Sequence, residues 1–271
     1  MKRYLYLLPI IFAMTSSCGG NLYNEISSKD SANALFIDAK NAINDLDYTT
    51  AINKILSIES SNPEFYNSCT TVDGIRRCPR EVLAGAYAGR CGFGLLSFIA
   101  SIGSSSGAVF SFLMNTFTDI AVNPDDCYQA QLVIETIGSP TELNSDQKIF
   151  MALLGMAKIG VYLRNDADQD QDGTTDPTFD ACSSGSISDD NVKQVITGLG
   201  LFLTYSAALS STGSATDDLA DISAVCGAAC NITDPTNPSL DASVVDSFRL
   251  IMTSLQYGVG TCDPLLPTCC P

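Results

Sequence analysis

The sequence predicts an all-α protein, either a compact bundle or a short superhelix of stacked antiparallel helix pairs, stapled by disulfides. Apolar residues recur at helical spacing through most of the chain, and strand signals are scarce. The 271 residues are 45% apolar, which is enough to fill a sizeable core. The 11 cysteines provide for several disulfides. Together these observations favour a globular helical fold over a disordered chain.

The charge balance and the lack of histidine exclude several function classes. The chain has 30 acidic and 14 basic side chains, a net charge of −16. Phosphate recognition needs clustered lysine and arginine, so we expect no nucleic-acid partner. Without histidine the chain cannot build a Ser-His-Asp or Cys-His nucleophile or an imidazole zinc site. The remaining acids fall where caps and solvated faces are common, so we expect no enzyme.

The N-terminus predicts export. Lys2 and Arg3 precede an apolar run over residues 4–14, which is typical of a signal peptide over residues 1–17. The small residues before Cys18 resemble a bacterial lipobox, although Leu is missing at its start. The resemblance implies a lipidated Cys18 and a place in the bacterial cell envelope. The glycines and polar residues that follow predict a flexible tether over residues 18–30, and the absence of Asp after Cys18 favours the outer membrane over the inner. The alternative is plain secretion with Cys18 removed.

An α-helical domain is predicted over residues 31–262, beginning with two amphipathic helices. In the first, Ser31 is an N-cap, and the apolar face includes Leu35, Ile37 and Leu46. The second has an apolar face from Tyr48 to Ile58, including Leu56, and ends at Asn62-Pro63. A polar loop with two cysteines follows.

The rest of this domain is also predicted to be helical. A helix begins near Pro79, and the uncharged residues 91–118 form a buried helical hairpin split by a Gly/Ser turn at 103–107, instead of a membrane span. Further helices are expected near 125–136, 145–164 and 242–257. The uncharged stretch 194–216 predicts a core helix. Residues 263–271 form a Cys- and Pro-rich tail.

Ten cysteines remain once Cys18 is set aside. An even number in an oxidising compartment predicts five disulfides, and a bond between Cys69 and Cys78 would close a short loop. A thiolate metal site or redox pair is the alternative. The candidates are Cys69, Cys78, Cys91, Cys127, Cys182, Cys226, Cys230, Cys262, Cys269 and Cys270.

Residues 166–182 resemble an EF-hand calcium loop. Alternating acids offer carboxylates to one cation, and Gly173 at the sixth position permits the sharp turn. Position twelve is Phe179 instead of Glu, and the next acid would replace it. The resemblance implies a structural calcium ion, with an acidic solvated loop as the alternative. The implied ligands are Asp168, Asp170, Asp172, the Thr174 carbonyl, Asp176 and Asp180.

Two segments resemble halves of a tetratricopeptide repeat. Residues 47–63 resemble the second helix, with Ile55 at its bulky position. Residues 83–87 resemble the Leu-Gly-x-x-Tyr of the first, with Ala84 where the Gly would be. Leu154-Gly155 repeats this weakly, with Lys158 in place of the aromatic residue. With the lipobox, the chain resembles periplasmic lipoproteins associated with TRAP-type solute transporters, whose helical repeats surround a cavity and dock a solute-binding protein.

These features lead to two function hypotheses. The first is a membrane-anchored bacterial lipoprotein that acts as a helical scaffold for an unidentified periplasmic or surface protein. The alternative is a small-ligand carrier or accessory subunit of a solute transporter. An elongated apolar cavity would favour the carrier, and a solid core would argue against it.

Overall fold

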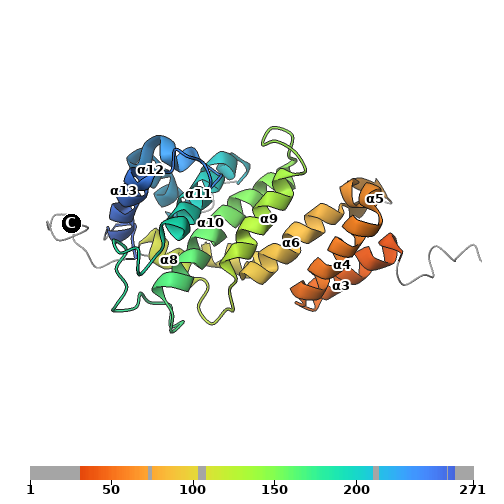
Figure 1. Cartoon of the computed structure of the whole chain (residues 1–271), viewed down its shortest axis with the longest axis horizontal. Coiled ribbons are helices and arrows are strands. Elements are labelled where there is room, and N and C mark those ends of the chain that lie inside the picture. The colour runs from red at the N-terminus through yellow and green to blue at the C-terminus, as the bar shows by residue number, and fades with distance from the viewer. Residues whose placement is uncertain (1–30, 73–74, 103–107, 210–213, 255, 260–271) are drawn as a thin grey trace, which may run out of the picture. The chain divides into compact units, whose positions relative to one another are not determined.

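The computed structural model describes residues 31–72, 75–102, 108–209, 214–254 and 256–259 (Figure 1). The predicted signal peptide, Cys18, the tether, Cys262 and the tail with Cys269 and Cys270 lie outside these ranges. The described chain is mostly helical, as predicted, with one short pair of strands. It divides into two compact units, Met1–Pro79 and Arg80–Pro271, here called unit 1 and unit 2. The prediction of one domain over residues 31–262 did not include this division.

Three helices form most of unit 1, and each begins at a side-chain cap. Ser31 Oγ accepts a hydrogen bond from the amide of Ala34, as its predicted N-cap role requires. Asn62 caps the third helix, where Pro63 occupies the first turn, so this proline both follows one helix and begins the next. The helices are α3 (Ala32–Asn44), α4 (Tyr48–Ser61) and α5 (Pro63–Asn67).

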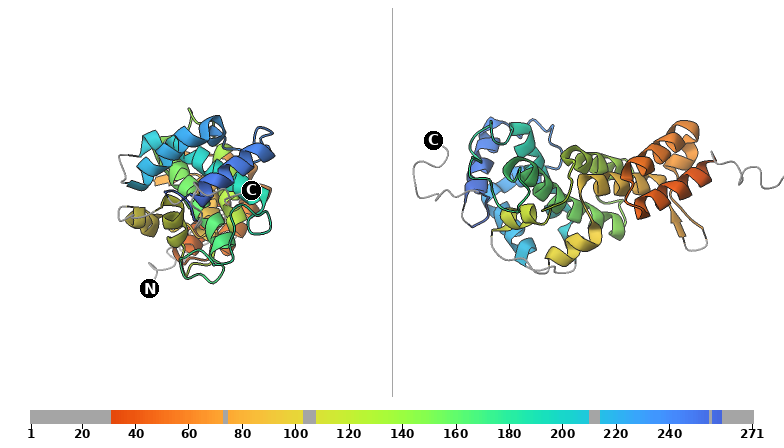
Figure 2. Two further views of the ribbon diagram at one scale, coloured as in Figure 1. Left: turned by 90° about the vertical axis from the view of Figure 1, so that its left-hand side faces the viewer. Right: turned by 90° about the horizontal axis from the view of Figure 1, so that it is seen from below.

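The predicted polar loop between the first two cysteines contains an antiparallel β-hairpin. Strands β1 (Thr70–Val72) and β2 (Ile75–Arg77) pair with Thr70 opposite Arg77, and Figure 2 shows them as a narrow ribbon. The Cys69–Cys78 disulfide joins the residues that flank the two strands. It therefore confirms the predicted bond and closes the open end of the hairpin, which allows such short strands to pair.

Three residues expected on the buried faces of the first two helices are exposed. Ile37 and Leu46 are 57% and 70% exposed, and Leu56 is 37% exposed. The core of unit 1 is instead built on a narrower stripe that includes Phe36, Ala39 and Ile55. The prediction was wrong for Ile37 and Leu56 because it took the apolar face to be wider than two packed helices can bury. Leu46 lies in the turn after α3, which ends at Asn44.

Unit 2 is built around one long helix, α10 (Ser145–Ala167), in which every residue from Met151 to Arg164 is buried (Figure 1). Its partner α11 (Asp189–Tyr205) runs in the opposite direction, since Lys158 contacts Thr197 and Asp166 contacts Asn191. The predicted core helix over residues 194–216 is this helix, which begins earlier and stops at Tyr205. The other helices are α6 (Pro79–Cys91), α7 (Leu95–Ile102), α8 (Val109–Asn115), α9 (Pro124–Glu135), α11 (Asp189–Tyr205), η1 (Ser206–Ala208), α12 (Ser214–Cys226), η2 (Gly227–Asn231) and α13 (Ala242–Thr253).

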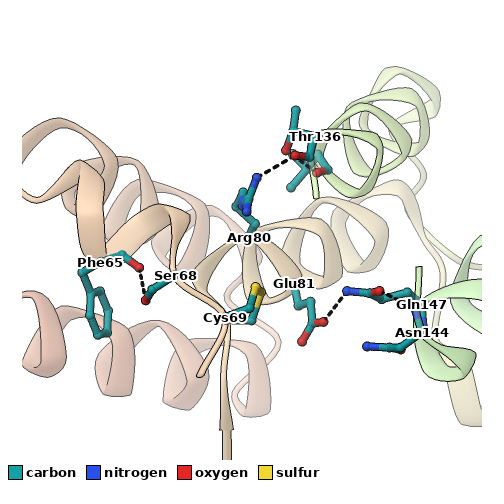
Figure 3. The surroundings of a disulfide bond; sticks show 10 residues. Phe65, Ser68, Cys69, Arg80, Glu81, Thr136, Asn144 and Gln147 are labelled. Atoms are coloured by element: carbon teal, nitrogen blue, oxygen red, sulfur yellow. Dashed lines mark hydrogen bonds between the residues drawn. A yellow bond between two sulfur atoms is a disulfide. The ribbon is translucent and has the colours of Figure 1, made fainter. Parts of the chain in front are cut away.

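Polar contacts attach the first helix of unit 2 to the helices that follow it. Arg80 Nη1 donates to the carbonyl oxygen of Thr136 over 2.7 Å, and Gln147 Nε2 donates to Glu81 Oε1 over the same distance (Figure 3). Gln147 also completes the capping box of α10 with Asn144. One side chain thus fixes the start of the central helix and joins it to α6.

Disulfides staple unit 2 as well. Cys91 is bonded to Cys127 and joins α6 to α9, while Cys226 is bonded to Cys230 where α12 meets η2. Cys182 is disulfide-bonded, and its partner lies outside the described residues. The prediction of disulfide staples is therefore confirmed for three complete pairs in the described chain.

Among the described residues, no helix has both the length and the apolar character needed to span a membrane.

Candidate functional site

The acidic loop after α10 brings three of the six predicted calcium ligands together. One carboxylate oxygen from each of Asp168, Asp170 and Asp172 lies within 4.8 Å of the others. Gly173 has φ +86°, which is the left-handed conformation that the predicted sharp turn requires. The local turn of the calcium-loop resemblance is thus present, and calcium itself stays a prediction.

Asp168 organises this loop from a fully buried position at the end of α10. Its Oδ1 accepts from the amide of Asp172 over 3.0 Å and its Oδ2 from the amide of Gly173 over 3.1 Å. Burial raises the pKa of Asp168, against the opposite effect of these two hydrogen bonds. Both oxygens already have backbone donors, so a cation here would share them.

Two other predicted ligands, Asp176 and Asp180, do not belong to this group of carboxylates, and Thr174 contacts one of its members. Thr174 donates through its amide and its hydroxyl to Asp172 Oδ1, both over 2.7 Å. Asp176 Oδ2 accepts from the amide of Gln169, and Asp180 Oδ1 accepts from the amide of Cys182. Their carboxylates therefore stabilise the turns of the loop.

A second site, which sequence reasoning missed, is a pocket on unit 2 with a cavity volume of about 620 Å³, here called the polar pocket. Its walls come from α9, from the end of α11 and from the segment after η2. Two carboxylates, two tyrosines and several hydroxyl and amide groups converge on it. The lining residues are Tyr128, Gln131, Leu132, Glu135, Gly138, Ser139, Pro140, Thr204, Tyr205, Asn231, Thr233, Asp234 and Thr236.

A buried lysine lies behind this pocket. Lys158 of α10 is fully buried, and its Nζ donates to Gln131 Oε1 over 3.0 Å and to Thr197 Oγ1 over 2.8 Å. The same nitrogen lies 5.1 Å from the centroid of the Tyr128 ring. Gln131 lines the pocket, so it links the buried amine to the pocket wall.

Burial lowers the pKa of Lys158 to about 7, although the negative charges of Glu135 and Asp234 act in the opposite direction. Two acceptors match the two N–H donors of a neutral amine, whereas an ammonium group has three. A group that changes charge near neutral pH, next to a pocket, is the kind of group found at functional sites.

The two carboxylates of the pocket are each held through one oxygen. Glu135 Oε1 accepts from Gln131 Nε2 over 2.8 Å, and that nitrogen also donates to the carbonyl of Thr233. Asp234 Oδ1 accepts from the amide and hydroxyl of Thr236. Burial raises the pKa of Glu135. Hydrogen bonds within the pocket thus fix both acids and leave a second oxygen on each.

No motif marks this pocket in the sequence, because its walls come from segments around residues 128–140, 204–205 and 231–236. One feature of the sequence did point to a polar site near α10. Lys158 is the only charged residue from Ile149 to Leu163, and a lone charge inside an apolar helix needs polar partners from neighbouring elements. One of those partners, Gln131, also lines the pocket.

Comparison of the chain with protein-family models, with curated proteins and with solved structures gives no match.

Proposed function

We propose that this protein is a lipid-anchored binding protein of the bacterial cell envelope that holds a small polar ligand in the polar pocket. The observation that carries the proposal is the convergence of Glu135, Asp234, Tyr128 and Tyr205 on one cavity of ligand size. This proposal follows the small-ligand carrier hypothesis from the sequence, with a polar ligand.

The anchor and the compartment rest on the sequence. Residues 1–17 and Cys18 support export and lipidation, and the disulfides suit an oxidising envelope. A calcium ion in the loop after α10 belongs to the proposal as a structural ion. We also propose that the protein binds its ligand without catalysis and acts beside a TRAP-type transporter. We further propose that its helices form a stack of antiparallel pairs.

The test isolates the full lipidated chain from its native membranes and identifies bound small molecules by mass spectrometry. Thr204→Trp places an indole in the pocket and should release the ligand, since Thr204 is a lining residue. Gln129→Trp is the matched control, because Gln129 is an exposed residue of α9 that does not line the pocket. Equal ligand content in the two variants would exclude the pocket as the binding site.

A scaffold for a periplasmic or surface protein is the second candidate. It is favoured by Ile37 and Leu46 of unit 1, whose exposure leaves apolar surface available to a partner. Crosslinking in native membranes tests it. A stoichiometric protein partner that is lost with Ile37→Glu and retained with Lys40→Glu, a change at another exposed α3 position, would support the scaffold.

A further inference from the structure

The polar pocket has the chemistry to recognise a positively charged amine. Its charged lining residues are Glu135 and Asp234, and both are acids. Each uses one carboxylate oxygen in the hydrogen bonds that hold the wall together. The second oxygen of each carboxylate has no hydrogen-bond partner among the described residues, so it can accept from a ligand.

The two tyrosines add a second and independent observation. Tyr205 is 5% exposed and lines the pocket, and its hydroxyl makes no hydrogen bond to the described residues. The Tyr128 hydroxyl likewise has none within the described chain. The Tyr205 side chain is thus mostly buried in the pocket wall, while its hydroxyl has no partner within the described chain, so a ligand in the pocket can supply one. Aromatic rings beside carboxylates are also the surroundings that an organic cation prefers.

We propose that the polar pocket binds an organic cation with a primary ammonium group, held by Glu135 and Asp234 and contacted by Tyr128 and Tyr205. This inference rests on the proposed ligand-binding function and names the class of ligand. The ammonium group donates to the two carboxylates, which fix its position, and the tyrosine rings cover its alkyl part. The same chemistry is offered by a free diamine and by the lysine side chain of a partner protein.

Lys158 makes this binding depend on pH. The positive charge of its ammonium form repels a cationic ligand and offsets the negative charges of Glu135 and Asp234, so it weakens binding. The neutral amine has neither effect. The elements packed against it contribute Tyr128 and Glu135 from α9, Asp234 from the segment after η2, and Tyr205 at the end of α11. Near Lys158, α11 presents the uncharged Thr197, and neither α8 nor η1 carries a charged side chain. We expect binding to strengthen from pH 6 to pH 8 and to release a proton at pH 7.

Titration calorimetry on the full mature lipidated chain in detergent tests the proposal. The probes are putrescine, Nα-acetyl-lysine amide and 1,4-butanediol, which matches the length of putrescine without its charge. We expect the amines to bind and the diol to give no heat. Tighter binding of putrescine would indicate a free amine, and tighter binding of the lysine derivative would indicate a protein side chain.

Variants connect the binding to this pocket. Glu135→Gln and Asp234→Asn keep the oxygen that each residue uses in the wall, and each should weaken amine binding about tenfold. Asp246→Asn, an exposed acid of α13 outside the pocket, makes the same change in net charge and should leave binding unchanged. Tyr205→Phe removes only the unpartnered hydroxyl and should weaken binding less.

The proposal is overturned if neither amine binds at pH 8, if the diol binds as well as putrescine, or if the two pocket variants bind like the Asp246 variant. Proton release, measured from the heat in two buffers of different ionisation enthalpy, needs no variant, and zero release at pH 7 would exclude the role of Lys158. If a ligand that is not an amine co-purifies and is lost with Thr204→Trp, the proposed function survives while this inference fails.

Discussion

Gly155 of α10 and Gly198 of α11 lie against each other where the two central helices cross. A Cβ atom on Gly155 would lie 2.5 Å from the carbonyl oxygen of Gly198, and one on Gly198 would lie 2.8 Å from the carbonyl oxygen of Gly155. The nearest atom in each case is a backbone oxygen, which cannot move aside as the end of a flexible side chain could. The packing of unit 2 depends on both positions lacking a side chain.

Gly198→Ala should destabilise the protein by about 2 kcal/mol or more, because the added methyl forces the helices apart. Gly85→Ala on α6 is the matched control, since a Cβ there meets nothing within 4 Å. Alanine is the better helix former, so this control should be neutral or stabilise by about 0.5 kcal/mol. Urea unfolding of the two variants and the parent chain provides the comparison, and equal effects would contradict the close crossing.

The ion pair beside the Cys91–Cys127 disulfide should contribute more to the free energy of unfolding than an exposed pair. Arg90 Nε and Nη2 donate to the two oxygens of Asp126 over 2.6 and 2.8 Å, and the Asp126 side chain is only 5% exposed. Arg90→Met leaves that carboxylate buried without its cation, so we expect a loss of about 3 kcal/mol in the free energy of unfolding. Lys193→Met breaks a pair with the exposed Asp190 and should cost less than about 1 kcal/mol.

Lys158 should make stability depend on pH. Its pKa is about 7 in the folded protein and about 10.4 in an unfolded chain. Between these values the unfolded chain binds the extra proton, so the free energy of unfolding rises with pH, by at most about 1.4 kcal/mol per pH unit. Below pH 7 both states hold the proton and this contribution no longer changes.

Urea unfolding of the parent chain and of Lys158→Met at several values of pH measures this contribution. The free energy of unfolding of the parent chain should increase relative to that of Lys158→Met as the pH increases from 7 to 10. Curves that stay parallel over this range would show that Lys158 keeps an ordinary pKa.

Calcium should stabilise the chain if the loop after α10 binds it. At a free calcium concentration about 30-fold above the dissociation constant, the gain is about 2 kcal/mol. Asp170→Asn should abolish the gain because Asp170 belongs to the grouped carboxylates. Asp180→Asn should retain it, because that carboxylate accepts from the amide of Cys182. Thermal unfolding with calcium, magnesium or a chelator makes the measurement, and no response to calcium would favour a plain acidic loop.

Disulfide mapping tests the cysteine prediction over the whole chain. Proteolysis without reduction should release three linked pairs, Cys69 with Cys78, Cys91 with Cys127, and Cys226 with Cys230. We also expect two further bonds, one of them involving Cys182, which is bonded to a residue outside the described ranges. Free thiols in the mature oxidised chain would contradict the count of five.

Periodicity and local chemistry were sufficient for the helices and their caps. The apolar repeat predicted α3, α4, α9 and α10 close to their observed bounds. Ser31 was recognised because an N-cap depends on residues within one turn. Gly173 was likewise predictable as the turn residue of the acidic loop, since its positive φ follows from its neighbours in the sequence.

The tertiary structure alone decided which residues are buried together. Ile37 has the same apolar character as its buried neighbours, yet it is exposed, because burial depends on the surface that a second helix covers. Lys158, Glu135 and Asp234 belong to three separate segments, and only folding brings the two negative charges close enough to act on the pKa of Lys158. The cysteine staples and the helical class were determined by local sequence chemistry. The pocket was not, because it depends on long-range packing that no local pattern records.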